Sequence, residues 1–482
     1  MSVKYRIGIF ILAAGFWLMV SAGSYAQMSQ EELRRERVET LDELKRTQDF
    51  SGSSSWVTRG LARGLGWRMN FGGWYAPSYS SSDENDRNVA AQDSLDHTWE
   101  NDFRFFTNVA SRSGKTQFYA RMKATQSLNS TPTGAVRRRD MVGPAVDLLY
   151  LQQQYPAGGW KHQITLGRQF VMVERGISFG LTVDGLHYKA LSRINEFQVF
   201  FARQNPSDDN IDNFSPGSGR TKRWFYGMEW KVKFMKTQTL DLFGLMNQDR
   251  NDESVNPATG QPHQLDSLYY GLGFEGRVIG NLRYWSMYIQ ESGKTYPSGG
   301  TTKVSISSSA IDGGLRYYFA TAMAPSFYVE YAAGSGDGDA QGSANSSFGG
   351  STAGKDERFI SFGGLTLGYA LAPQLTNIQV YKFGASVKPF GWSANRLWSD
   401  MSVQPTYYLY SRDKASGVTS DPYISSGAGS SRKIGSEFDM TVAWKAAVDI
   451  SYQFKFGRFS PGPAYTNRGA ENYMRLKFSL DL

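Results

Sequence analysis

The sequence has no cysteine and little histidine. None of its 482 residues is a cysteine, so a disulfide framework and thiolate metal sites are both excluded. The histidines are His97, His162, His187 and His263. No two of them have the spacing of metal ligands. We therefore expect no metal site and no cofactor.

Long hydrophobic runs and catalytic motifs are also missing. Mean hydropathy is −0.44, which argues against a bundle of membrane-spanning helices beyond the N-terminus. No Gly-x-Ser-x-Gly elbow occurs, so a lipase or protease has little support. The stretch Gly271-Leu-Gly-Phe-Glu-Gly276 matches a dinucleotide-binding pattern, but it lies inside an alternating segment with no helix after it. We do not expect an enzyme.

The N-terminus has the features of a secretory signal peptide over residues 1–26. Lys4 and Arg6 give the charged start, an apolar stretch follows over 7–20, and small residues precede the expected cleavage after Ala26. Residues 27–60 then form a predicted periplasmic segment with a short amphipathic helix over 30–49. That helix is either a solvated leader or a plug or partner-binding element.

From residue 61 to residue 482 the dominant pattern is alternation, and it is clearest at the end of the chain. The residues of one parity are all apolar: Met474, Leu476, Phe478, Leu480 and Leu482. The other parity is nearly all polar: Tyr473, Arg475, Lys477, Ser479 and Asp481. Successive side chains of a strand point to opposite faces. Together with many similar stretches before it, the pattern predicts a transmembrane β-barrel whose apolar face contacts lipid.

The alternation predicts about eighteen antiparallel strands, with sixteen as the alternative. The predicted segments are 63–75, 95–109, 116–127, 143–154, 161–169, 184–192, 194–204, 221–234, 238–248, 265–277, 281–292, 309–321, 324–333, 357–370, 374–388, 400–412, 434–456 and 470–482.

Loop lengths test the strand assignment. Barrels of this class have short periplasmic turns and longer extracellular loops, so long connections are expected after odd-numbered strands. The long connection 413–432 follows the sixteenth predicted strand instead. Either a pair of strands has been missed, or this is a long periplasmic loop that gates the pore.

Several stretches, spread over most of the mature chain, resemble the alginate export family of outer-membrane barrels. They are Leu166-Gly-Arg-Gln169, Val183-Asp-Gly-Leu186, Ala332-Ala-Gly-Ser-Gly-Asp337, Phe383-Gly-Ala-Ser-Val-Lys-Pro389, Gly435-Ser-Glu-Phe-Asp439 and Phe459-Ser-Pro-Gly462. The chain ends in Leu482 and not in the aromatic residue more usual in such barrels.

This resemblance implies an eighteen-stranded monomer in the outer membrane of a Gram-negative bacterium. It also implies an Arg-rich lumen for a polyuronate chain and a long periplasmic loop near strand sixteen that occludes the pore. As an exporter of an anionic polysaccharide, the barrel is expected to work with periplasmic and inner-membrane export partners. Two alternatives stay open: a porin for small anionic nutrients, and a structural or receptor barrel closed by its loops.

The formal net charge of +8 fits an anionic partner, namely an anionic polysaccharide, small anions or anionic lipid. Nucleic acid is not expected as a partner of an exported barrel. The predicted inward-facing cations are Arg104, Arg121, Lys123, His187, Lys189, Lys231, Arg316, Lys445 and Arg475. The predicted inward-facing acids are Glu100, Asp102, Glu229, Glu275, Glu330, Glu437 and Asp439.

Fixed cations along the lumen would offset the charge of a polyanion, and interleaved acids would keep its binding weak enough for movement. The competing interpretation is that these residues pair as salt bridges that only stabilise the wall.

Arg168 presents a separate problem, because it shares the parity of Ile164 and Leu166 and so points towards lipid. An arginine near the membrane midplane is costly. One alternative is that Ile164 and Leu166 face inward instead. We favour two others: a position at the rim, where Arg168 and Asp184 form a structural pair, or a bulge at Gly167 that reverses the alternation.

Overall fold

The structure is a computed structural model that describes residues 67–83, 87–88, 96–130, 138–204, 223–250, 264–298, 300–340, 351–424 and 430–482. The predicted signal peptide and the predicted helix at 30–49 lie outside these residues. The strands are β1 (Trp67–Asp83), β2 (Asp96–Ser111), β3 (Thr116–Ser130), β4 (Arg138–Ala157), β5 (Trp160–Val173), β6 (Phe179–Leu191), β7 (Asn195–Gln204), β8 (Arg223–Met235), β9 (Gln238–Asp249), β10 (Leu265–Ile279), β11 (Leu282–Thr295), β12 (Val304–Tyr318), β13 (Ser326–Gly334), β14 (Ile378–Ser386), β15 (Ser402–Ser411), β16 (Lys433–Lys445), β17 (Ile450–Pro461) and β18 (Glu471–Asp481).

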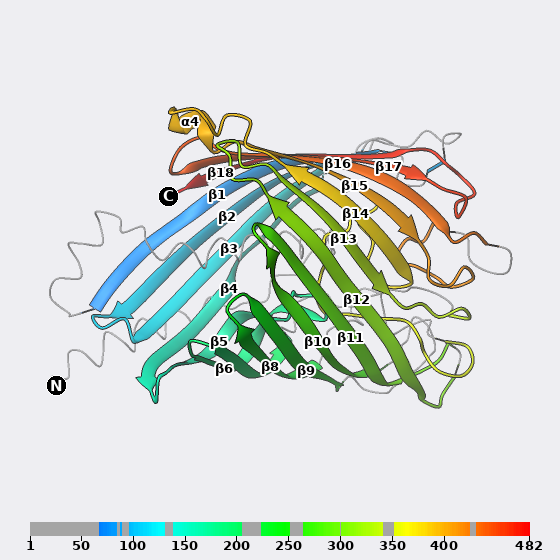
Figure 1. Cartoon of the computed structure of the whole chain (residues 1–482), viewed down its shortest axis with the longest axis horizontal. Helices are drawn as coiled ribbons and strands as arrows, with labels where there is room; N and C mark the ends of the chain where they lie inside the picture. The colour runs from blue at the N-terminus through cyan, green and yellow to red at the C-terminus, as the bar shows by residue number, and fades with distance from the viewer. Residues whose placement is uncertain are drawn as a thin grey trace.

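The strands form one closed antiparallel sheet of eighteen strands, as Figure 1 shows. Each strand pairs with its neighbours in the sequence, and β18 returns to pair with β1. Gly73 and Leu482 exchange backbone hydrogen bonds of 3.2 and 2.8 Å at this junction. Closure leaves no edge strand, which is the condition for a sheet to cross a membrane. The predicted all-β barrel is confirmed.

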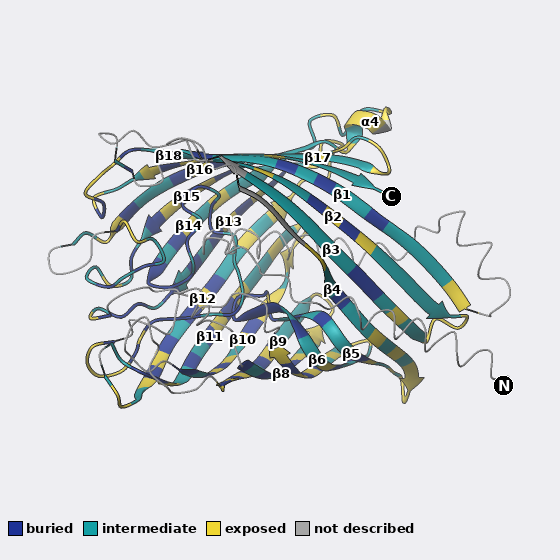
Figure 2. Ribbon diagram, turned by 180° about the vertical axis from the view of Figure 1, so that it is seen from behind, coloured by how far each residue is buried: buried dark blue, intermediate teal, exposed yellow. Residues whose placement is uncertain are grey.

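Alternation of side chains separates the outer wall from the lumen. In β18, Leu476 is exposed on the outer face, whereas Tyr473 is buried on the inner face. Figure 2 shows buried and exposed positions alternating along many of the strands. Large apolar side chains are exposed on the outside because lipid, not water, is their expected surroundings.

The two ends of the barrel differ. The C-terminus lies on the same side of the barrel as the short turns and α4 (Arg396–Ser399), while long connections gather at the opposite end of the barrel (Figure 1). Short turns mark the periplasmic end of such barrels. We therefore assign the end with long connections to the cell exterior. No helix in the described part of the chain is long and apolar enough to cross a membrane.

Two predicted strands were wrong, and their errors cancelled in the total. Residues 357–370 are not a strand but part of a loop between β13 and β14 that packs inside the barrel. The predicted strand at 434–456 is two strands, β16 and β17, joined by a tight turn in which Ala447 and Ile450 bond to each other. Paired residues such as Trp444 and Tyr452 share one parity across this turn, so the alternation shows no break there.

The predicted periplasmic gate at 413–432 was therefore also wrong. With 357–370 removed from the strand count, this connection joins β15 to β16 and lies at the exterior end with the other long loops. The connection 413–432 therefore obeys the rule that long loops lie at the exterior end. It had looked like an exception only because 357–370 was counted as a strand.

Leu476→Arg tests which face of β18 contacts lipid. We expect a cost of about 2–4 kcal/mol in the free energy of unfolding from lipid, because the residue lies mid-strand on the outer face. Ser479→Arg, on the inward parity of the same strand, is the matched control and should cost less than about 1 kcal/mol. Urea unfolding in vesicles measures both. Equal losses would contradict the assignment of faces.

Candidate functional site

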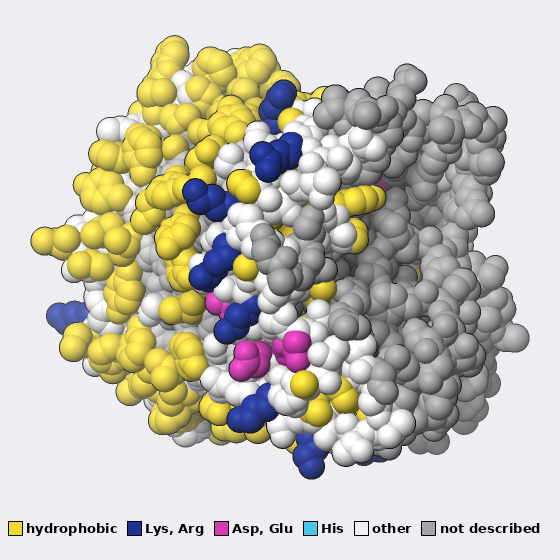
Figure 3. Space-filling view, turned by 90° about the vertical axis from the view of Figure 1, so that its right-hand side faces the viewer, with side chains coloured by type: hydrophobic (Ala, Val, Ile, Leu, Met, Phe, Trp, Pro, Cys, Tyr) yellow, Lys and Arg dark blue, Asp and Glu magenta, His cyan; other side chains and the backbone are white. Residues whose placement is uncertain are grey.

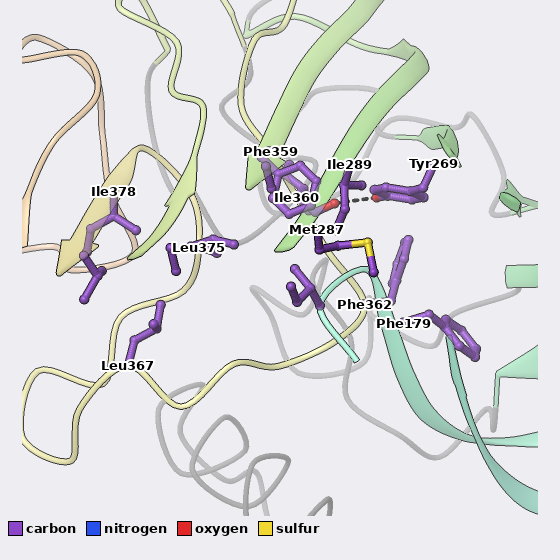
Figure 4. Packing of buried hydrophobic residues seen from close by; sticks show 14 of the residues in the cluster. Phe179, Tyr269, Met287, Ile289, Phe359, Ile360, Phe362, Leu367, Leu375 and Ile378 are labelled. Atoms are coloured by element: carbon purple, nitrogen blue, oxygen red, sulfur yellow. Dashed lines mark hydrogen bonds between the residues drawn. The ribbon is translucent and has the colours of Figure 1, made fainter. Parts of the chain in front are cut away.

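A loop from the exterior end folds into the lumen. The segment 351–377 lies between β13 and β14, and its apolar side chains belong to a buried hydrophobic cluster that includes residues of the barrel wall. Figure 4 shows Phe359, Ile360 and Phe362 of this segment against side chains of the barrel wall. We call this segment the inward loop. Its hydrophobic residues occur where the wall is locally apolar, at positions such as Phe179 and Met287.

One part of the inward loop is attached to two places on the wall. The backbone N–H of Phe362 donates to the carbonyl of Ser178 at 2.9 Å, next to β6. The hydroxyl of Tyr269 on β10 donates to the carbonyl of Ile360 (Figure 4). The N–H of Ile360 donates to the carboxylate of Glu291 on β11 at 3.1 Å. The loop is thus held between two separate parts of the ring of strands.

A third attachment point is Glu437 on β16. Its carboxylate accepts hydrogen bonds from the backbone N–H groups of Tyr369 at 2.6 Å, Ala370 at 2.7 Å and Leu371 at 3.0 Å. The hydroxyl of Tyr410 also donates to it at 3.1 Å. Glu437 is only 1% exposed, so these four donors compensate a buried carboxylate that would otherwise be very costly. The attachments near β6, β10–β11 and β16 are spread around the ring, so the inward loop crosses the lumen.

The turn after β5 also points inward. Glu174 is left-handed, with φ of 49°, and its carboxylate accepts hydrogen bonds from the N–H groups of Ile177 at 3.0 Å and Ser178 at 2.8 Å. Burial raises the pKa of Glu174 to about 7, and the nearby Glu229 adds to the rise. Glu229 itself accepts from the N–H of Glu174 at 2.5 Å.

Arg175 follows in the same turn and had not been predicted from the sequence. Its guanidinium reaches Asp312 on β12 at 3.1 Å and lies over the ring of Trp285 on β11 at 4.8 Å. Arg175 lies in a connecting turn, where side chains do not alternate as they do in a strand, so the sequence did not indicate that it points into the lumen.

The predicted cations on β2 and β3 form a buried group. Arg104 binds Asp102 at 2.8 Å, Arg121 binds Asp147 at 2.5 Å, and both guanidinium groups lie over the ring of Trp74. Arg104 is 5% exposed and Arg121 is 1% exposed. Two acids therefore hold these two arginines in the wall. Neighbouring Lys123, on the same parity of β3, is partly exposed.

The predicted residues on β6 to β8 form a second polar group. His187 is buried and bonds through Nε2 to Gln198 at 2.9 Å. Lys231 contacts Glu229 at 3.2 Å and is partly exposed, as is Lys189. Glu229 therefore holds both Lys231 and the inward turn.

A third group lies on β12 to β15 beside the inward loop. Arg316 lies 4.5 Å from the ring centre of Tyr328, and the predicted acid Glu330 is 3.7 Å from Lys382. Lys382 also donates to the carbonyl of Thr366 in the inward loop at 3.4 Å. Lys382 was missed in the sequence, although Tyr381 and Phe383 on either side are exposed on the outer face.

The remaining predicted residues lie on β16 and β18. Arg475 donates to Ser78 across the β1–β18 junction at 3.2 Å, Lys445 is exposed at the periplasmic end, and Asp439 is buried near Glu437. Lys455 on β17 was also missed, although it shares the inward parity of Lys445. Its ammonium group lies 5.0 Å from the ring centre of Tyr369 in the inward loop.

Comparison with known proteins agrees with this geometry. The family model described as alginate export matches residues 68–478. The chain belongs to the alginate export family. No curated protein matches the sequence.

Solved structures similar to this alginate export family barrel include three from Pseudomonas aeruginosa. OccK5 (OpdH) has a TM-score of 0.55 at 10% identity, covering 86% of this chain and 98% of that one. OpdK with vanillate has a TM-score of 0.54 at 11% identity, with the same coverage. OccK11 (OpdR) has a TM-score of 0.51 at 11% identity, covering 86% and 96%. At these identities the likeness shows the fold alone.

Family and fold together place this alginate export family member in the outer membrane of a Gram-negative bacterium, where it is a transport channel. Within the described residues, no group of three or more His, Cys, Asp or Glu side chains could hold a metal ion.

The pair of Arg168 and Asp184 lies on the outer wall. The two carboxylate oxygens accept from the guanidinium at 2.8 and 3.0 Å, and Arg168 also donates to the carbonyl of Val146 at 2.9 Å. Pairing of β5 with β6 runs without a register shift, so the alternation is not reversed at Gly167. Of the two expectations, the bulge is therefore wrong. Arg168 remains on the face of Leu166, which is 58% exposed.

Glu437→Ala should release the inward loop from β16, because three backbone N–H groups lose a charged acceptor, at a cost of about 3 kcal/mol. The expected results are a larger single-channel conductance and faster hydrogen exchange at the amides of Tyr369, Ala370 and Leu371, which donate to Glu437 when the loop is docked. Glu275→Gln is the matched control: Glu275 is an exposed acid of the inward parity near the periplasmic end of β10, away from the attachments of the inward loop, and its loss should change neither. A Glu437→Ala channel with a protected loop and unchanged conductance would contradict the anchoring role.

Ionisation of Glu174 should loosen the inward turn as pH rises. Its pKa in the folded protein, about 7, exceeds the ordinary value of 4.5, so the stability it contributes is complete below about pH 4.5 and is lost as pH rises through 7. The loss is on the order of 3 kcal/mol. Hydrogen exchange at the amides of Ile177 and Ser178, corrected for intrinsic rates, measures it between pH 5 and pH 8. Glu174→Gln should remove this dependence, and an unchanged dependence would contradict the assignment to Glu174.

Proposed function

We propose that this channel passes an anionic polysaccharide, an alginate-like polyuronate, or a related anionic solute. The observation that supports this most directly is the contact of two inward lysines with the inward loop. Lys382 donates to Thr366 and Lys455 lies over Tyr369. The inward loop thus lies against two cations of the lumenal wall.

These contacts suit a path that must bind and then release its solute. A lysine ammonium is a compact charge on a flexible stem, and it can exchange a carbonyl or an aromatic ring for a passing carboxylate. Glu330 stands beside Lys382 and keeps its attraction for an anion moderate. Weak binding at several sites is what conduction requires. In this proposal the inward loop is the constriction, and it takes the role that the sequence had assigned to 413–432.

A second candidate is a channel for small organic anions. The observation in its favour is that the inward loop and the inward turn both occupy the lumen. A lumen divided in this way suits a small solute better than a bulky chain, unless the loop moves. One structural neighbour was solved with vanillate, a small carboxylate. For either solute we propose a monomeric barrel, and polysaccharide export would need periplasmic partners.

Planar-bilayer recording separates these candidates. Polyuronate should block the wild-type current, and the double variant Lys382→Gln, Lys455→Gln should raise the half-blocking concentration roughly tenfold, which corresponds to about 1.4 kcal/mol. Arg283→Gln is the matched control, because Arg283 is an exposed cation over an aromatic ring, Tyr318, at the periplasmic end. It should leave the block unchanged.

Other results of the bilayer recording would favour a different function. Current that is carried by small carboxylates but is insensitive to polyuronate would favour the second candidate. An absence of current in the wild type and in Glu437→Ala would overturn both and favour a closed structural or receptor barrel. Equal effects of the double variant and the control would contradict the assigned roles of the two lysines.

A further inference from the structure

Three arginines lie on the outer wall, towards the exterior ends of alternate strands. Arg168 lies on β5, Arg203 on β7, and Arg250 directly after β9. Arg168 has the parity of the lipid-facing Leu166, and Arg203 has that of Phe201, which is 42% exposed. We call these three residues the arginine cluster.

Strand pairing connects the arginine cluster into one row. Arg168 lies opposite Asp184, and Asp184 lies opposite Arg203 on the next strand. Arg203 in turn lies opposite Trp224 on β8. The guanidinium groups of Arg203 and Arg250 are 5.9 and 5.6 Å from the ring centre of Trp224, so one indole lies between two cations.

The position of the arginine cluster along the membrane normal follows from the bounds of its strands. Arg168 is the ninth residue of β5 and Arg203 the ninth residue of β7, counted from the periplasmic turns. A strand needs about 9–11 residues to cross the hydrocarbon. Both residues therefore lie near the outer border of the hydrophobic wall. Figure 3, which faces the exterior end, shows basic side chains following the border between the hydrophobic side chains and the polar end.

Among the described residues of the row, the charge is unbalanced. Asp184 binds Arg168 at 2.8 Å, so three guanidinium groups against this one carboxylate give a formal charge of +2. Arg250 donates to Gln248, which is neutral. Arginines facing lipid at the border of the hydrocarbon need an anion in the headgroup layer. A guanidinium pair spaced around an indole suits phosphate, which accepts bidentate hydrogen bonds.

We propose that the arginine cluster binds the phosphate groups of lipid A, with Trp224 placed against its sugar backbone. The outer leaflet of a Gram-negative outer membrane is built of lipopolysaccharide, whose lipid A carries phosphates at the border between acyl chains and sugars. The exterior position of the cluster selects this lipid over the phospholipids of the inner leaflet. Trp224 has the amphipathic ring that is favoured at such a border. The site is on the outer wall and is independent of what the lumen transports.

The test compares lipid retention by purified barrels. Native mass spectrometry in detergent, with added bisphosphorylated lipid A, should show bound lipid on the wild type. The double variant Arg203→Gln, Arg250→Gln should weaken this binding by about tenfold or more, because each surface arginine contributes about 1 kcal/mol towards an anionic lipid. Arg168 is left intact, since its loss would strand Asp184 and disturb the wall.

Several controls decide the result. Arg283→Gln, at the periplasmic end, should retain lipid A like the wild type. Dephosphorylated lipid A should bind the wild type no better than it binds the double variant. Cold sodium dodecyl sulfate electrophoresis, in which a folded barrel migrates faster than an unfolded one, confirms that each variant is folded. Lysine at both positions should restore part of the binding, because the charge returns without the bidentate geometry.

Three results would overturn the proposal. One is retention of lipid A by the folded double variant at the wild-type level. Another is equal retention of phosphatidylglycerol and lipid A, which would show a general contact with anionic lipid. The third is an equal loss in Arg283→Gln, which would assign the binding to net charge and not to this cluster.

Discussion

Closure of the sheet is the constraint on which the rest of the molecule depends. Lipid offers no hydrogen bonds to a backbone, so each N–H and C=O group in the membrane must find a partner in a neighbouring strand. The pairing of β18 with β1 completes the ring and removes the last edge. Once the ring is closed, alternation assigns every side chain to lipid or to the lumen. The start of β1 and the end of β18 then lie at the same end of the barrel, and the long connections at the other end are free to fold inward.

The inward loop shows how a polar lumen can hold an apolar segment. A wall of alternating polar residues offers little hydrophobic contact, so the loop packs only where the wall is locally apolar, around Phe179 and Met287. Elsewhere buried carboxylates hold it. Glu437 and Glu291 accept its backbone N–H groups, which have no strand partner. An unpaired N–H in such a place costs about as much as a lost hydrogen bond, so acids that look like part of a transport path stabilise the loop instead.

Much of this fold could be predicted from the sequence, because a lipid-facing strand must alternate whatever its neighbours are. The errors arose where that rule does not apply. Residues 357–370 resembled a strand because they are apolar, but their partners are far apart in the sequence and no local pattern indicates an inward fold. The turn between β16 and β17 escaped notice because residues paired across a hairpin keep their parity.

The candidate site could be predicted only in part, because alternation gives the side of the sheet and not the contacts across the lumen. Parity suggested which side of a strand each cation occupies, and Lys455 could have been found in this way, but parity does not identify the residue that each cation contacts.

Two arginines and two lysines of the described barrel have contacts of different kinds. Arg104 and Arg121 have fixed carboxylate partners and belong to the wall, since a planar guanidinium bound in this way loses little by staying in place. Lys382, besides its ion pair of 3.7 Å with Glu330, donates to a carbonyl of the inward loop, and Lys455 lies over a ring of that loop. A carbonyl or a ring binds a cation more weakly than a carboxylate does. A mobile anion can compete with such partners, whereas it could not displace a buried aspartate from an arginine. For a solute that must leave as readily as it enters, a lysine next to a movable loop is therefore the more suitable contact. The arginines of the outer wall, facing a lipid that stays bound, are suited to the opposite task.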